Sequence, residues 1–120
     1  MKFQSTSTAL PAENEYPKLI RDKIPKIITD HTGRQTVTRV LKDDEEFLRF
    51  LLKKVVEEAE ELSKSVNDSN VAEEIADIYE VIDALLKFKS ISREYVLAVQ
   101  EKKRNKRGGF EERLLMLKKN

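Results

Sequence analysis

The chain has 120 residues, of which 39% are hydrophobic and 38% charged, and its formal net charge at pH 7 is +1. A net charge so close to zero argues against a general nucleic-acid binder, because proteins of that class usually carry a strong basic excess. The absence of cysteine excludes disulfides and thiolate metal sites, and the single histidine, His31, excludes a multi-histidine zinc site. Any bound metal would therefore need oxygen ligands.

Length and composition favour a single helical domain. Three Gly and three Pro are few for a turn-rich sheet protein of this length. No stretch is long and apolar enough to cross a bilayer, and the first residues lack the apolar block of a secretory signal, so we expect a soluble, cytoplasmic protein. Residues 1–15 are polar without a sustained period and are expected to form a flexible tail. The domain is expected to span residues 16–120.

The first predicted helix lies within YPKLIRDKIPKIITDHTG, residues 16–33. Asp22 can cap this helix, Pro25 is tolerated in its first turn, and Gly33 follows its expected end. The next stretch, RQTVTRVL, is rich in β-branched residues but isolated. We therefore expect at most a minor strand or an extended arm there.

The first long helix is predicted to follow Asp43, which has Glu46 three residues later, the spacing of a capping box. Apolar residues then recur at helical spacing from Phe47 to about Leu62 or Val66.

A second long helix is predicted after the polar break SVNDSN. Asn70 and Glu73 again have the spacing of a capping box, and an apolar stripe continues to Leu85. A third helix is predicted to start near Ser92 and to stop at the glycines of EKKRNKRGG, residues 101–109. The basic cluster would lie in its last turns, where the helix dipole favours cations.

Four carboxylates of the two long helices are expected to face one another. At roughly 100° per residue, Glu58 falls within the apolar face of the first long helix and Glu61 along its edge, while Glu74 and Asp77 lie beside the apolar stripe of the second. In an antiparallel hairpin the two pairs lie at similar distances from the turn, so the four carboxylates would converge. Such a group is unfavourable unless it is protonated, paired with lysines or bound to divalent cations. Oxygen ligands suit Mg²⁺ or Mn²⁺.

An alternative interpretation needs no metal. The spacings E-x-x-E and E-x-x-D are common on the solvated faces of amphipathic helices, where acids pair with nearby lysines. The chain would then be a non-catalytic helical interaction module whose apolar stripes dock partner helices. Such a module gives no reason to place Glu58 within an apolar face.

One sequence pattern resembles a known family. Glu57, Glu58 and Glu61 form E-E-x-x-E, which is followed after twelve residues by E-x-x-D at Glu74 and Asp77. This pattern resembles the signature of the MazG-like all-α nucleoside triphosphate pyrophosphohydrolases. That superfamily also contains the dimeric dUTPases and the phosphoribosyl-ATP pyrophosphohydrolases.

The flanking segments extend the resemblance from about residue 16 to residue 117. YPKLIRDKIPKII, RVLKDDEEFLRFLLKKVVEEAEEL and KRGGFEERLLML are similar to a small single-domain branch of house-cleaning enzymes for noncanonical nucleotides. The resemblance implies Mg²⁺-dependent hydrolysis between the α- and β-phosphates of a nucleoside triphosphate, giving a monophosphate and pyrophosphate. Phosphoribosyl-ATP hydrolysis is the alternative within the superfamily, and the substrate base stays open.

The resemblance also implies roles for the acids. Glu58, Glu61, Glu74 and Asp77 correspond to the metal ligands of the family. Glu57 and Glu61 are the two candidates for the group that takes a proton from the attacking water.

Substrate phosphates would also need cations. The family often has basic residues near KRGG that contact phosphates, and Lys103 and Arg107, four apart on one helix face, are the expected pair. Lys54 either balances the acidic face or reaches a phosphate. Arg21 is a further candidate, although the role of its KLIRDK stretch does not follow from the sequence. A three-helix unit of this size has few ways to cover both faces of its hairpin, so a homodimer or larger bundle is expected, in which sites could be built across subunits.

Overall fold

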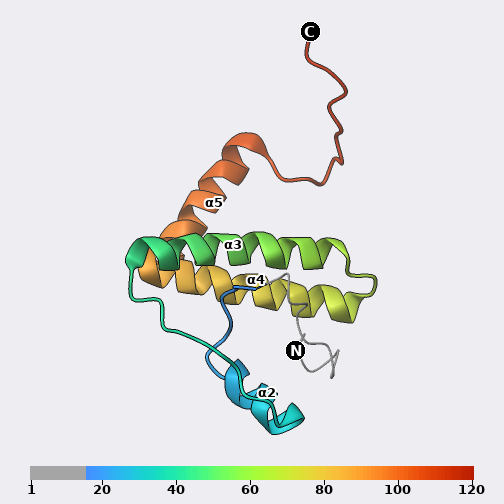
Figure 1. The fold of residues 1–120 in the computed structure, drawn as a ribbon. Helices are drawn as coiled ribbons and strands as arrows, with labels where there is room; N and C mark the ends of the chain where they lie inside the picture. The colour runs from blue at the N-terminus through green and yellow to red at the C-terminus, as the bar shows by residue number, and fades with distance from the viewer. Residues whose placement is uncertain (1–15) are drawn as a thin grey trace.

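The computed structural model describes residues 16–120, which form four α-helices and no strand, so the predicted all-α class is confirmed. None of these helices is long and apolar enough to cross a membrane. The predicted tail, residues 1–15, lies outside the described residues. The helices are α2 (Ile24–Thr32), α3 (Asp44–Ser63), α4 (Asp68–Lys89) and α5 (Arg93–Arg107), shown in Figure 1.

The start of α2 corrects one prediction, because Asp22 does not cap it. Lys23 occupies the cap position without a side-chain hydrogen bond. The N–H of Ile24 instead donates to the carbonyl of Arg21 at 3.0 Å, so a backbone turn satisfies this N–H at the start of the helix. At the other end Gly33 adopts a φ of 72°, the left-handed conformation that ends many helices.

The two long helices begin with side-chain caps, one predicted correctly and one displaced. The Asp43 carboxylate accepts the N–H of Glu46 at 3.0 Å, as predicted. The cap of α4 is Asn67, whose side-chain oxygen accepts the N–H of Asn70 at 2.9 Å, so the prediction of Asn70 as the cap is wrong by three residues. The earlier start places Asp68 in the first turn of α4, where the helix dipole favours an acid.

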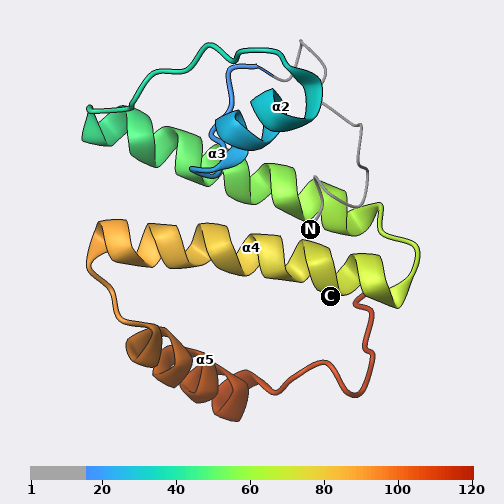
Figure 2. The same ribbon diagram turned by 90° about the horizontal axis from the view of Figure 1, so that it is seen from below.

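The helices α3 and α4 form an antiparallel hairpin around a short turn, residues 64–67. They run side by side in both views of the molecule (Figures 1 and 2), and they are the helix pair that packs extensively within residues 16–120. Leu51, 2% exposed, is the fully buried apolar side chain of the described core. At the end of the hairpin opposite the turn, the rings of Phe47 and Phe88 meet edge to face at 5.4 Å between centroids.

The chain beyond α4 leaves the hairpin. Ser92 caps α5 by accepting the N–H of Tyr95, and Gly108 follows its end, both as predicted. Figure 2 shows α5 turning away from α4, and every residue from 93 to 120 is exposed. We call residues 93–120 the C-terminal arm.

The stretch RQTVTRVL forms no strand and connects α2 to α3 as irregular chain. Arg39 of this stretch donates two hydrogen bonds to the Glu46 carboxylate, at 3.0 and 2.7 Å. This pair holds the connection against the first turn of α3.

Candidate metal centre

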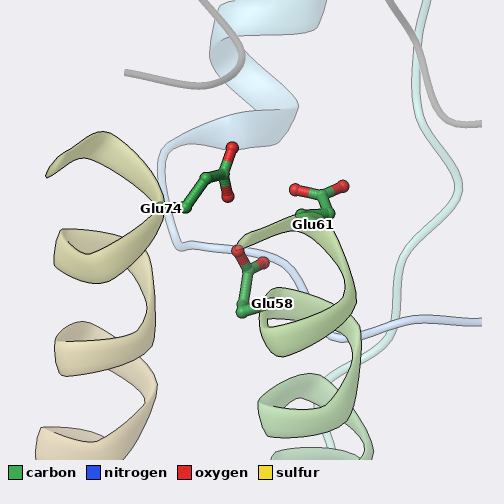
Figure 3. Close-up of side chains that lie close together, drawn as sticks. All are labelled: Glu58, Glu61 and Glu74. Carbon is green, nitrogen blue, oxygen red and sulfur yellow. The ribbon is translucent and has the colours of Figure 1, made fainter. Parts of the chain in front are cut away.

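Three carboxylates meet between α3 and α4 near the turn of the hairpin. Glu58 and Glu61 project from α3 and Glu74 from α4 toward the same space (Figure 3). One oxygen of each lies within 4.8 Å of one oxygen of each of the others. Glu58 is only 3% exposed, and Glu61 and Glu74 are half-buried. We call these three residues the acid trio.

The helical period explains why Glu58 is buried. Leu51 and Glu58 are seven residues apart, about two turns, and so lie on the same side of α3. That side faces α4, so the position that the core pattern would fill with an apolar residue holds a carboxylate. Burial of a carboxylate is costly without compensation, which indicates that Glu58 has a role other than solvation of the helix.

Asp77, the fourth predicted ligand, lies about one turn beyond Glu74 on α4 and outside the acid trio. Its Oδ1 is 2.7 Å from Nη2 of Arg21, and its side chain is 14% exposed. Arg21 comes from the segment that precedes α2, so a residue 56 positions earlier in the chain neutralises this carboxylate.

Glu57 is held by two lysines at the edge of the acid trio. Lys18 and Lys54 each place Nζ 3.3 Å from its Oε1, and Lys54 also lies 3.6 Å from Oε1 of Glu58. Burial raises the pKa of the Glu57 carboxyl, but the charges and hydrogen bonds of Lys54 and Lys18 outweigh that effect and keep its pKa below the ordinary value. A carboxylate with a lowered pKa is a weaker base, so the lysine contacts argue against Glu57 as a proton acceptor.

The contacts of Lys18 and Arg21 give the KLIRDK stretch a role that sequence reasoning missed. Both side chains reach from an irregular segment to acids of the hairpin, Lys18 to Glu57 and Arg21 to Asp77. No periodic pattern links these positions. We call Lys18 and Arg21 the clasp. These two residues supply positive charge to the acidic end of the hairpin.

The four predicted phosphate-binding residues fall into two groups. Lys54 and Arg21 contact the acids around the trio. Lys103 and Arg107 lie on α5, where they line an open hollow with Phe110 at the bend after the helix. The arm does not bring them to the acid trio of the same chain, because α5 leaves the hairpin at the end opposite the turn (Figure 1).

The donor set of the acid trio fits a hard divalent cation. Carboxylate oxygens are the ligands that Mg²⁺ and Mn²⁺ prefer. The three side chains come from two helices whose packing fixes their relative positions, and Glu58 is shielded from competing water. Asp77 would become a further ligand if Arg21 released it.

No protein-family model matches the chain, and no curated protein or solved structure matches it. The resemblance to the MazG-like pyrophosphohydrolases therefore stays a prediction that rests on the sequence motifs quoted above.

Proposed function

We propose that this protein is a nucleoside triphosphate pyrophosphohydrolase that depends on Mg²⁺, with Mn²⁺ as a substitute. The observation that carries the proposal is the acid trio: Glu58, Glu61 and Glu74 converge from two helices, and the first of them is buried in the seam of the hairpin. The E-E-x-x-E and E-x-x-D motifs, which match the predicted signature, supply the same residues. Acids on a solvated helix face would require neither the convergence of three carboxylates nor the burial of Glu58.

In this proposal the side chains of the site have different roles. Glu58, Glu61 and Glu74 hold the cation, which when bound neutralises phosphate charge and activates water for attack. Lys54 lies close enough to Glu58 to contact a phosphate placed against the trio. If Arg21 left Asp77 for the substrate, Asp77 could hold the cation as well.

The reaction breaks the bond between the α- and β-phosphates. A water oxygen forms a bond to phosphorus in line with the bridging oxygen, and that bridging oxygen leaves with the departing phosphate group. One proton of the water goes to Glu61, and the other stays on the oxygen that has bonded to phosphorus. The products are a nucleoside monophosphate and pyrophosphate.

The proposed substrates are noncanonical nucleoside triphosphates, in a cytoplasmic house-cleaning role. Phosphoribosyl-ATP is the alternative substrate within the same chemistry. The sequence KLIRDKIP favours the first, because it is the segment that resembles the house-cleaning branch.

A second candidate function, a non-catalytic helical interaction module, is favoured by one observation. The C-terminal arm exposes large apolar side chains, including Tyr95 at 65% and Phe110 at 95%. Surfaces of this kind mark contacts with other proteins. This function predicts no response to metal and no turnover.

The test is pyrophosphate release from a panel of canonical and modified nucleoside triphosphates with Mg²⁺. Glu74→Gln should lower kcat/KM by about 100-fold or more, because a cation contributes several kcal/mol to stabilisation of the transition state. The matched control is Glu80→Gln, an exposed acid on the same helix, which should retain wild-type turnover. Undiminished turnover in Glu74→Gln would reject the metal assignment, and no release from any nucleotide would favour the interaction module.

A further inference from the structure

The chain leaves far more surface exposed than a folded monomer of its size. Its accessible surface is 10541 Å², whereas a monomer of 14.0 kDa exposes about 6,700 Å². Its radius of gyration is 17.9 Å, against about 14 Å for a compact chain of this length. The excess per chain is larger than the roughly 800 Å² that each partner of a standard protein interface buries.

The C-terminal arm accounts for much of the exposed apolar surface. Along α5 it exposes Tyr95 and Leu97, and beyond the helix the apolar side chains are between 81% and 95% exposed. These last residues are Phe110, Leu114, Leu115, Met116 and Leu117. Monomeric proteins rarely leave so many large apolar side chains uncovered in one segment.

The hairpin has exposed apolar positions of its own. Leu52 and Val56 of α3, four residues apart, are 48% and 57% exposed, and Ala59 extends the same stripe by three residues. On α4 Tyr79 is 61% exposed. The hairpin therefore presents an apolar outer surface as well as the face that forms its core.

The charges of the arm and the hairpin are opposite. Residues 93–120 contain nine basic and four acidic residues, a net charge of +5. Residues 44–89 contain six basic and thirteen acidic residues, a net charge of −7. The chain as a whole is almost neutral only because these two segments balance, and complementary charge favours their association.

The arm does not use this complementarity within its own chain. Ser90, Ile91 and Ser92 connect α4 to α5, and an ion pair between Arg93 and Asp83 fixes the point where the arm leaves. From there α5 runs away from the hairpin (Figures 1 and 2), so its basic end lies away from the acid trio of the same chain.

We infer that a second copy of this chain covers these surfaces, with the arm of each copy lying along the hairpin of the other. The occupant is a second copy because one chain carries both complementary surfaces, so a two-fold exchange satisfies both at once. Lys103 and Arg107 of each arm then face the acid trio of the partner and complete its phosphate-binding side. This last assignment rests on the proposed function; the exchange of arms does not.

The exchange can be tested on the full chain without any activity. Light scattering should give twice the chain mass of 14.0 kDa. Because the sequence has no cysteine, Val66→Cys in the hairpin turn and Arg104→Cys in the arm introduce unique thiols. A bismaleimide should join these two variants into a mixed covalent dimer. A monomeric mass, or a dimer without this cross-link, would overturn the exchange.

A double variant separates exchange from folding back within one chain. When Val66→Cys/Arg104→Cys is diluted into a large excess of the cysteine-free protein and the copies are allowed to exchange, its internal pair should no longer cross-link. A cross-link that persists within a single chain would show that the arm covers its own hairpin, and the proposal would be wrong.

The contribution of Lys103 and Arg107 to the partner's site is tested by mixing two impaired variants. Glu74→Gln lacks a metal ligand, and Lys103→Gln/Arg107→Gln lacks the basic pair. A mixed dimer regains one intact site, so random mixing should restore about one quarter of wild-type turnover. Mixed dimers, isolated with a different affinity tag on each variant, that remain inactive would overturn this assignment. If the wild type hydrolyses no nucleotide, the proposed function fails, while mass and cross-linking still decide the exchange.

Discussion

The α3–α4 hairpin and the C-terminal arm are both helical, but only the hairpin has a partner within the chain. Both regions have side-chain caps, Asp43 and Asn67 in the hairpin and Ser92 in the arm. In the hairpin, packing buries Leu51 and places a carboxylate in the seam, whereas the arm buries none of its residues. Local sequence therefore determines where a helix forms, and its function depends on what covers its apolar face.

The largest expected difference between the two regions concerns stability. Leu51→Ala should lower the free energy of unfolding by about 2–5 kcal/mol, because it opens a cavity at the centre of the hairpin. Leu97→Ala in α5, where the side chain is 54% exposed, should cost less than about 1 kcal/mol at the same protein concentration. Urea unfolding of both variants measures this. Equal losses would show that the arm is as well packed as the hairpin.

The helical parts of this comparison were largely predictable because capping and period act over a few residues. Asp43, Ser92 and Gly108 end or begin helices as predicted. The α4 cap was displaced because two asparagines stand three residues apart in the break, and either side chain can cap a helix.

The site was predictable only where it depends on helical period. The inward direction of Glu58 followed from its position two turns after Leu51. The pairing of Arg21 with Asp77 did not, because Arg21 lies in an irregular segment whose position is set by tertiary contacts. The sequence also did not show that Lys103 and Arg107 would lie away from the acids, because helical period places residues around α5 but does not set the direction in which α5 leaves the hairpin.

A second prediction concerns the buried carboxylate itself. Without divalent metal, Glu58→Leu should raise the free energy of unfolding by about 1–3 kcal/mol, since it replaces a buried charge near two other carboxylates with an apolar side chain. Lys54, which loses its contact with Glu58, keeps its ion pair with Glu57 at 3.3 Å. Glu60→Leu, at an exposed position of the same helix, should change it by no more than about 0.5 kcal/mol. Thermal or urea unfolding in a chelator measures both. A marked loss of stability in Glu58→Leu would mean that this carboxylate serves the fold rather than a cation.

A third, smaller effect concerns the clasp. Because the Arg21–Asp77 pair is partly exposed, Arg21→Ala should lower the free energy of unfolding in a chelator by only about 0.5 kcal/mol. With saturating Mg²⁺ this loss should shrink, since Asp77 then has a cation as its partner. Lys26→Ala removes the exposed Lys26–Asp30 pair on α2 and should not respond to metal. The same loss from Arg21→Ala with and without Mg²⁺ would argue against transfer of Asp77 to the cation.

The smallest effect concerns pH. The lysines lower the pKa of Glu57 in the folded chain, so its contribution to stability is fully present above the unfolded carboxyl pKa of about 4.3 and is lost as pH falls through the lower folded value. Glu57→Gln should therefore weaken the loss of stability below about pH 4.3. Urea midpoints between pH 6 and pH 3 measure this, with the exposed Glu60→Gln as the control. If Glu57→Gln loses stability in acid as steeply as the wild type, the lysine contacts of Glu57 are contradicted.

The most direct test of the acid trio is thermal unfolding of the full chain with and without millimolar Mg²⁺ or Mn²⁺. A cation bound to the folded state alone at 100 times its Kd adds about 2.7 kcal/mol to the free energy of unfolding, so the wild-type Tm should rise by several degrees. The rise should persist in Glu80→Gln and disappear in Glu74→Gln. No rise in the wild type, or an equal rise in all three proteins, would contradict a metal centre at Glu58, Glu61 and Glu74.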